Sequence, residues 1–260
     1  MLLPYFHVAA FTNVVFGGNP AGVCRLERWL PDELLQRVAR ENNLSETAFY
    51  LRSASGDYEL RWFTPEVEVD LCGHATLATA HVLWTHHGET SDPLSFATRS
   101  GPLTVAREGS RLALNFPARP AQPAEMPPDV AQAFSLQPLS CGKARDYLFE
   151  FRDEEEVRNL KPDFTRFLAW EGLGVIATAP GREVDFVSRF FAPKAGLAED
   201  PVTGSSHCTL IPFWAQRLGK KILRAKQVSA RGGELFCEAL GDRVKIAGHA
   251  VTYLQGTIEI

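Results

Sequence analysis

The sequence predicts an α+β fold built from two similar halves, and three observations support this prediction. Many short segments have the composition of strands, few have helical periodicity, and the strict strand–helix alternation of a doubly wound sheet is absent. Four short motifs each recur once, in the same order and at nearly constant spacing. The length of 260 residues suits one or two domains.

The recurring motifs lie 128 to 132 residues apart, which is close to half of the chain. The pairs are 62–65 with 190–193, 70–76 with 200–206, 99–103 with 231–235, and 109–112 with 241–244. Coincidence between short strings could explain one pair, but four pairs in one order indicate two diverged copies of one unit. We predict domains at residues 1–118 and 119–260, with a Pro-rich linker at 117–128. A ligand would then bind between the two halves.

Strand composition marks segments in both halves, bounded by turns that contain glycine or charged residues. These segments are 58–63, 103–107, 111–116, 147–152, 175–179, 186–191, 243–247 and 251–254.

Helices are fewer. One is predicted over 31–41, with Pro31 in its first turn and apolar residues on one face. Gly73 opens a second helix that runs to about Trp84. Gly204 opens a third, in which Pro212 should introduce a kink or delay the regular part.

Composition excludes several classes of protein. A net charge of −4 gives no basic excess to neutralise a nucleic-acid backbone. No apolar run approaches the ~20 residues that span a bilayer, and the amino end lacks the basic region of a signal peptide. Five scattered cysteines without a CxxC pair suit a reducing compartment. We therefore expect a cytoplasmic protein without nucleic-acid or membrane partners.

No metal or nucleotide cofactor is expected either. The histidines show no HExxH spacing, and the sequence contains neither GxGxxG nor GxxxxGK[ST].

The two glycine-opened helices are candidates for binding an anion. Glycine lets a ligand approach the backbone, and the first N–H groups of a helix have no partner within it. Two such helix starts could bind a small carboxylate through N–H groups and helix dipoles. Gly73 and Gly204 could instead only begin packed helices, but their matching positions in the repeat favour a shared role.

Candidate proton carriers lie near these helix starts. Glu46 precedes an apolar run, so its carboxyl group could be partly buried and act in acid/base catalysis, although a lone glutamate is more often solvated. His74 and Ser205 occupy matching positions, each one residue after the glycine that opens its helix. Asp200 lies just upstream of the second helix.

Cysteines at both helix starts would indicate a racemase in which one thiolate removes an α-proton and the other thiol returns one. The first repeat has Cys72, but Thr203 stands at the matching position, and Cys208 lies about one turn into the helix. The two-thiol mechanism therefore lacks half of its groups.

Several strings occur in order along almost the whole chain: Phe11-Thr12, Gly18-Asn19-Pro20-Ala21-Gly22-Val23, Ser45-Glu46-Thr47-Ala48-Phe49, Asp70-Leu71-Cys72-Gly73-His74-Ala75-Thr76 and Glu199-Asp200-Pro201-Val202-Thr203-Gly204-Ser205. Together they resemble the phenazine-biosynthesis PhzF-like isomerase family. The resemblance implies the diaminopimelate-epimerase-like fold, in which two similar α+β domains each wrap a barrel-like sheet around a central helix. It also implies that the active site lies between the domains and that the last strand can return to the first one. It further implies an enzyme without a cofactor, commonly a homodimer.

The best-understood member of that family isomerises trans-2,3-dihydro-3-hydroxyanthranilate by moving a proton across the ring. Its proton-carrying glutamate falls on Glu46, and the family's histidine, aspartate and serine fall on His74, Asp200 and Ser205. The residues expected to bind substrate are Ser45, Gly73, Gly204 and Asn19. Ser206 stands where many relatives have alanine, a departure that can alter the pocket.

The resemblance thus implies a cofactor-independent isomerase that moves a proton within a small carboxylate-bearing metabolite. Two alternatives remain open, namely an amino-acid racemase or epimerase, and a non-catalytic small-molecule-binding protein on the same fold.

Overall fold

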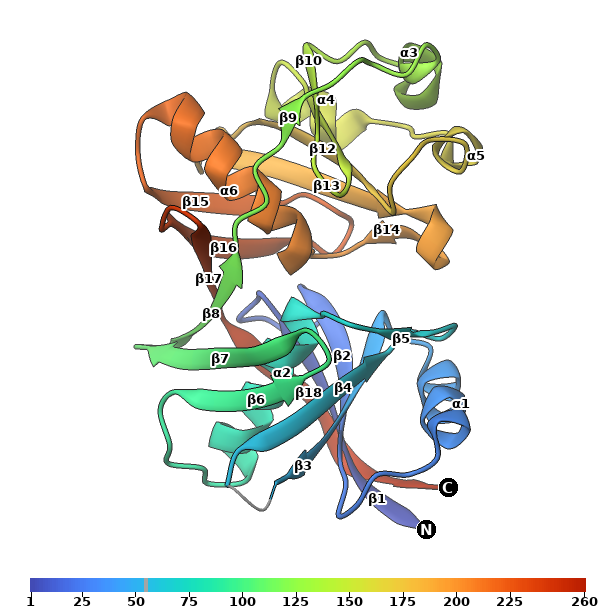
Figure 1. Cartoon of the computed structure of the whole chain (residues 1–260), viewed down its shortest axis with the longest axis vertical. Helices are drawn as coiled ribbons and strands as arrows, with labels where there is room; N and C mark the ends of the chain where they lie inside the picture. Colours follow the sequence, from blue (N-terminus) through green and yellow to red (C-terminus); the bar gives the residue numbers. More distant parts are fainter. Residues whose placement is uncertain (54–55) are drawn as a thin grey trace. The chain divides into compact units, whose positions relative to one another are not determined.

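The computed structural model describes residues 1–53 and 56–260. By its internal contacts the chain divides into two compact units. Unit 1 comprises Met1–Asn115 and Ala247–Ile260, and unit 2 comprises Phe116–Ile246 (Figure 1). No helix in the described part of the chain is long and apolar enough to cross a membrane.

Unit 1 is a sheet that surrounds one helix. Its elements are β1 (Leu2–Ala10), β2 (Asn19–Arg25), α1 (Asp32–Asn42), β3 (Glu46–Arg52), β4 (Tyr58–Phe63), β5 (Glu68–Val69), α2 (Gly73–His86), β6 (Leu94–Thr98), β7 (Gly101–Glu108), β8 (Arg111–Pro117) and β18 (Ala250–Glu259). Hydrogen-bonded neighbours follow the order β18, β1, β2, β3, β4, β6, β7 and β8, and β5 adds to β4. The pairs β2–β3 and β4–β6 are parallel, and the other pairs are antiparallel.

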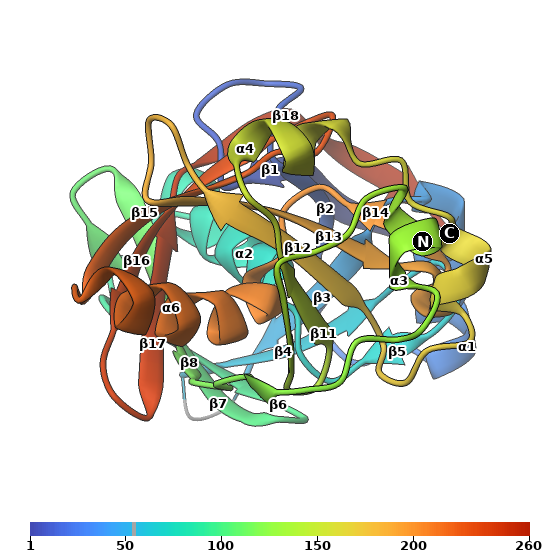
Figure 2. The same ribbon diagram turned by 90° about the horizontal axis from the view of Figure 1, so that it is seen from above.

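Helix α2 forms the centre of unit 1. It contacts β1, β2, β3, β7 and β18, and Figure 2 shows it among these strands. Every residue from Gly73 to Ala80 is buried. A helix that is buried all round must be short of charged side chains, and α2 contains none apart from its histidines. Its first turn therefore lies inside the unit, beside the starts of strands.

Unit 2 repeats this arrangement. Its elements are β9 (Gln122–Pro123), α3 (Val130–Phe134), β10 (Ser140–Lys143), β11 (Tyr147–Glu150), α4 (Glu154–Asn159), α5 (Phe164–Phe167), β12 (Val175–Pro180), β13 (Phe186–Ala192), η1 (Pro193–Ala195), β14 (Leu197–Asp200), α6 (Gly204–Leu218), β15 (Ile222–Gln227), β16 (Gly233–Ala239) and β17 (Arg243–Gly248). The parallel pairs β11–β12 and β13–β15 stand where β2–β3 and β4–β6 stand in unit 1. The predicted α+β class with two similar halves is confirmed.

A matching ion pair marks the same place in both repeats. Arg61 donates two hydrogen bonds to Glu68, at 2.7 and 2.8 Å. Arg189 donates two hydrogen bonds to Glu199 at the same two distances. Each two-bond pair ties a long strand to the short strand after it, which leads toward the central helix. The repeat therefore extends from backbone topology to side-chain contacts.

The third predicted helix differs from expectation at Pro212. Helix α6 begins at Gly204 and continues through Pro212 to Leu218, so the proline does not delay it. Pro212 has no N–H to bond the carbonyl oxygen of Cys208 four residues earlier. That oxygen instead accepts a hydrogen bond from the backbone N–H of Arg119, at 2.8 Å. The chain segment before β9 thus supplies the hydrogen-bond donor that the proline cannot offer to this carbonyl oxygen.

Candidate active site

Glu46 and His74 meet inside unit 1. Glu46 is the first residue of β3, and His74 is the second residue of α2. Oε2 of Glu46 lies 3.1 Å from Nε2 of His74. The side chains are 17% and 5% exposed, respectively. The two atoms are close enough for an ion pair but are not aligned as a hydrogen bond.

The other ring nitrogen of His74 faces two further polar groups. The side-chain amide nitrogen of Asn19 lies 3.2 Å from Nδ1, and the thiol sulfur of Cys72 lies 3.5 Å from it. Asn19 can offer Nδ1 either its NH₂ group or, by turning the amide over, its oxygen. Asn19 can therefore partner both the neutral and the protonated ring.

A tight glycine turn places Asn19 beside the ring. Gly18 has a φ of +63°, and a Cβ atom there would lie 2.2 Å from the carbonyl oxygen of Ala10. Only glycine fits this close approach. The turn starts β2 at Asn19, whose side chain is fully buried.

The surroundings shift the pKa values of His74 and Cys72 upward. Burial lowers the pKa of His74, but the nearby Cys72 and Glu46 outweigh burial and raise it well above its ordinary value. Burial, aided by the negative charge of Glu46, raises the pKa of the Cys72 thiol to about 11. A thiol with so high a pKa keeps its proton near neutral pH, so Glu46 is the negative group that favours a protonated ring there.

The start of α2 supplies backbone donors at the same place. Cys72 precedes the helix in an extended conformation, and its carbonyl oxygen accepts the N–H of Thr76 at 3.3 Å. The N–H groups of residues 73–75 precede that first helical hydrogen bond, so they have no acceptor within the helix. Gly73 is among these residues. Ser45 is half-buried and directly precedes β3.

The cluster of Glu46, Cys72 and His74 is not prearranged to hold a metal ion. Ligand atoms of Glu46, Cys72 and His74 lie within 4.8 Å of one another. However, Cys72 faces Nδ1 of the ring and Glu46 faces Nε2. Because one ion cannot bind both nitrogens of one imidazole, the group would have to rearrange to coordinate it.

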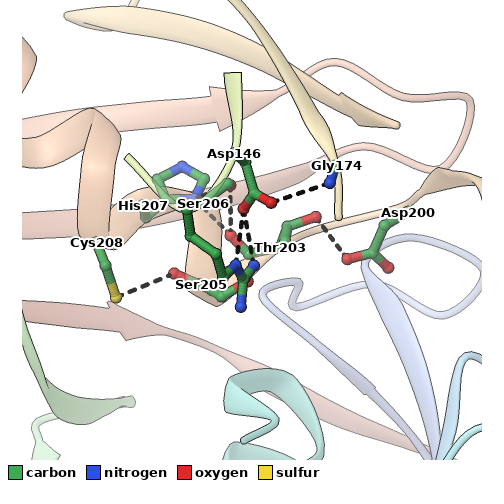
Figure 3. Close-up of polar contacts among 10 residues, drawn as sticks. Asp146, Gly174, Asp200, Thr203, Ser205, Ser206, His207 and Cys208 are labelled. Carbon is green, nitrogen blue, oxygen red and sulfur yellow. Dashed lines mark hydrogen bonds and ion pairs between the residues drawn. The ribbon is translucent and has the colours of Figure 1, made fainter. Parts of the chain in front are cut away.

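In unit 2, Asp200 belongs to a buried hydrogen-bond network just before α6. The hydroxyl of Thr203 donates to Oδ2 of Asp200 at 2.5 Å (Figure 3). The buried Gln227 accepts the backbone N–H of Thr203 at 2.9 Å and donates to the backbone oxygen of Asp200 at 2.6 Å. Gln227 therefore ties together both ends of the segment that carries Asp200.

Ser205, one residue after Gly204, is half-buried at the start of α6. Its Oγ accepts a hydrogen bond from Nη2 of Arg145 at 3.2 Å. Arg145 is bonded in turn to Asp146, the residue next to it.

Ser206 and His207 face the interior of unit 2. The hydroxyl of Ser206 donates to the carbonyl oxygen of Thr203 at 2.9 Å. Nδ1 of His207 lies 2.7 Å from the same oxygen and carries the proton, since a carbonyl can only accept. Burial lowers the pKa of His207 to about 4, so the ring is neutral near pH 7.

The sequence motifs contain Glu46, His74, Asp200 and Ser205 but not all of the residues that support Asp200 and Ser205. Arg145, Asp146 and Gln227 lie in a turn and a strand end that carry no motif. The internal repeat could not have located them, because it reports matching positions rather than contacts between distant segments.

The chain consists of two α+β units with the same topology, as expected for an internal duplication. The buried carboxylate–imidazole pair at the start of the central helix of unit 1 is a candidate acid/base site. Known proteins share this fold. A family model described as phenazine biosynthesis-like protein matches residues 8–256. An uncharacterized isomerase of Pseudomonas aeruginosa is 51% identical over 260 residues, covering 100% of both chains.

Two solved structures extend the comparison. The crystal structure of a PhzF-family phenazine biosynthesis protein from Enterococcus faecalis has a TM-score of 0.97 at 46% identity and covers 100% of both chains. A predicted epimerase from Pseudomonas aeruginosa has a TM-score of 0.77 at 21% identity over 99% of both chains, which shows a shared fold alone. The chain belongs to the phenazine biosynthesis-like family, and the resemblance seen in its motifs is confirmed.

Proposed function

We propose that this protein is a cofactor-independent isomerase that moves a proton within a small carboxylate-bearing metabolite. The relative named as an isomerase supports the class of reaction. The observation that carries the proposal is the largely buried carboxylate of Glu46, held 3.1 Å from His74. A carboxylate so placed can take a proton from carbon and be shielded while it holds it.

In the proposed mechanism Glu46 is the general base and then the general acid. Its carboxylate removes a proton from a carbon of the substrate, and the electron pair left behind delocalises into the adjoining unsaturated system. The carboxylic acid so formed then gives the proton to another carbon. Oε1 of Glu46 is hydrogen-bonded to none of the described residues, which leaves it for the substrate. His74 would hold the carboxylate of Glu46 in place through its contact with Oε2.

The other predicted site residues receive proposed roles in binding. Backbone N–H groups at the helix starts marked by Gly73 and Gly204 would bind the substrate's carboxylate. Ser45 is proposed as a substrate contact beside Glu46. Asn19 is proposed to act through His74, whose ring it contacts.

Asp200 is proposed to hydrogen-bond the substrate's amine or hydroxyl group, and Ser205 is proposed to assist in binding the substrate. This proposal rests on the family motif that contains them and on the polar networks that hold them in unit 2.

A racemase that uses Cys72 is the second candidate, because the thiol belongs to the same cluster. Its raised pKa of about 11 counts against the thiolate form that such a base requires. We expect Cys72→Ser to keep turnover within a few-fold of the wild type. A loss of 100-fold or more would favour the racemase.

The test is proton NMR of trans-2,3-dihydro-3-hydroxyanthranilate with the wild type, Glu46→Gln and the exposed control Glu66→Gln. We expect conversion by the wild type and the control, and a loss of roughly 10²-fold or more in Glu46→Gln. Folding of each variant is checked by circular dichroism. Turnover by Glu46→Gln at the wild-type rate would reject Glu46 as the base. If no folded protein converts the compound, this substrate is rejected and the non-catalytic binding alternative gains support.

We also propose a homodimer, as the family resemblance implies. Light scattering coupled to gel filtration should then give twice the chain mass of 28.8 kDa. A monomer mass at micromolar concentration would contradict this. The cytoplasmic location stays a prediction.

A further inference from the structure

Arg145 lies in the turn between β10 and β11, 60 residues before Ser205 in sequence but in contact with it. Its Nη2 donates to the hydroxyl oxygen of Ser205 at 3.2 Å. Its Nε and Nη2 both donate to Oδ2 of Asp146, at 3.0 and 2.8 Å. The side chain of Arg145 is 37% exposed, whereas that of Asp146 is 5% exposed. The cation therefore faces outward from a buried carboxylate.

The turn that carries Arg145 is held in place from behind. Oδ1 of Asp146 accepts the backbone N–H of Gly174 at 2.9 Å (Figure 3). Gly172 has a φ of +88°, and a Cβ atom there would lie 2.9 Å from the carbonyl oxygen of Arg145. The 172–174 segment thus packs directly against the turn. These contacts fix the direction of the guanidinium group before any ligand binds.

Two hydrogen-bond donors, one on Arg145 and one on Ser205, remain for a ligand. Arginine has five N–H donors, and Nη1 of Arg145 is bonded to no residue in the ranges 1–53 and 56–260. Since the oxygen of Ser205 accepts from Arg145, its own hydrogen is directed elsewhere. Nη1–H of Arg145 and O–H of Ser205 thus form a pair of neighbouring donors. Two such donors, one of them on a cationic group, suit a carboxylate, whose two oxygens only accept.

We propose that Arg145 is a specificity-determining residue that binds the substrate's carboxylate together with the hydroxyl of Ser205. The inference rests on the proposed function for the class of substrate. It deepens that function by assigning a charged side chain to the recognition of the anion. Asp146 is a positioning residue that acts through Arg145.

The competing explanation is that Arg145 only fastens the turn to α6. A residue with that role affects stability without distinguishing charged from neutral ligands. The test therefore compares 2-aminobenzoate with 2-aminobenzamide, which replaces the carboxylate by a neutral amide. Binding of each is measured by calorimetry at one ionic strength, and turnover is not needed.

We expect the wild type to bind the carboxylate at least 10-fold more tightly than the amide. In Arg145→Gln this ratio should fall to near 1, and Arg145→Lys should restore part of it, because lysine keeps the charge without the planar fork. Arg152→Gln is the matched control, since Arg152 also pairs with the aspartate that follows it. The control should keep the wild-type ratio.

A wild type without preference for the carboxylate would overturn the inference. So would an unchanged ratio in a folded Arg145→Gln variant. These outcomes are independent of Glu46. If Glu46→Gln loses turnover while the ratio persists in Arg145→Gln, only the inference about Arg145 is wrong. If Glu46→Gln remains active while the ratio falls, Arg145 binds the carboxylate and the proposed base is wrong.

Discussion

Nε2 of His74 lies 3.1 Å from Oε2 of Glu46, with both atoms buried and neither aligned for a hydrogen bond to the other. A loosely aligned pair suits a carboxylate that must change protonation state, because catalytic hydrogen bonds often tighten only once substrate is bound. The protonated ring would stabilise the ionised carboxylate before proton removal. The protonated ring would also favour the return of the proton to the substrate, because that step restores the ionised carboxylate.

The raised pKa of His74 predicts a specific dependence of stability on pH. Its folded-state pKa lies above the unfolded value of about 6.5, so the stabilising contribution is complete below that pH. The contribution is lost as the pH rises through the folded-state pKa. Urea unfolding between pH 6 and 9 should therefore show a steeper loss of stability in the wild type than in His74→Gln. Parallel curves for the two proteins would show that folding does not raise the pKa of the ring.

His207 predicts the opposite dependence. Burial holds its folded-state pKa at about 4, whereas the unfolded chain takes up the proton below about pH 6.5. Stability should fall as the pH drops from about 6.5 to 4, by as much as about 3 kcal/mol. In His207→Phe the slope of unfolding free energy against pH over this range should be smaller. The oxygen of Thr203 still accepts a bond from Ser206 in that variant. An unchanged slope would contradict the neutral buried ring.

The hydroxyl of Thr203 is expected to matter for catalysis because it holds the carboxylate of Asp200 at 2.5 Å. Thr203→Val keeps the shape of the side chain but removes the donor. The loss of a hydrogen bond to a charged group, worth about 1.5–3 kcal/mol, predicts roughly 10- to 100-fold slower turnover. Thr203→Ser keeps the hydroxyl and should stay within a few-fold of the wild type. Equal activity of the valine and serine variants would show that the hydroxyl of Thr203 does not contribute to turnover.

The sequence predicted the local features of the fold well. The strand 58–63 and the starts of α2 and α6 at Gly73 and Gly204 are as expected, because glycine and alternating apolar residues act over a few positions. The first helix runs over Asp32–Asn42, so Pro31 stands just before it rather than in its first turn. Pro212 does not delay α6, and the partner of the Cys208 carbonyl comes from Arg119, far away in the chain.

The candidate site could be predicted only in part for the same reason. Glu46 and His74 stand out through motifs, but their contact depends on how β3 and α2 pack. Asn19 approaches His74 from 55 residues away, and Arg145 approaches Ser205 from 60 residues away. Such contacts follow from tertiary packing, which a single sequence does not display.

The central claim is that Glu46 carries a proton from one carbon of the substrate to another. The most direct measurement is the isotope content of the product when the wild type converts trans-2,3-dihydro-3-hydroxyanthranilate in D₂O. A carboxyl group that is only 17% exposed should exchange slowly, so the account predicts that part of the product keeps protium at the receiving carbon. It also predicts that Glu46→Gln forms almost no product. Complete deuteration by the wild type, with product formed equally fast by Glu46→Gln, would contradict it.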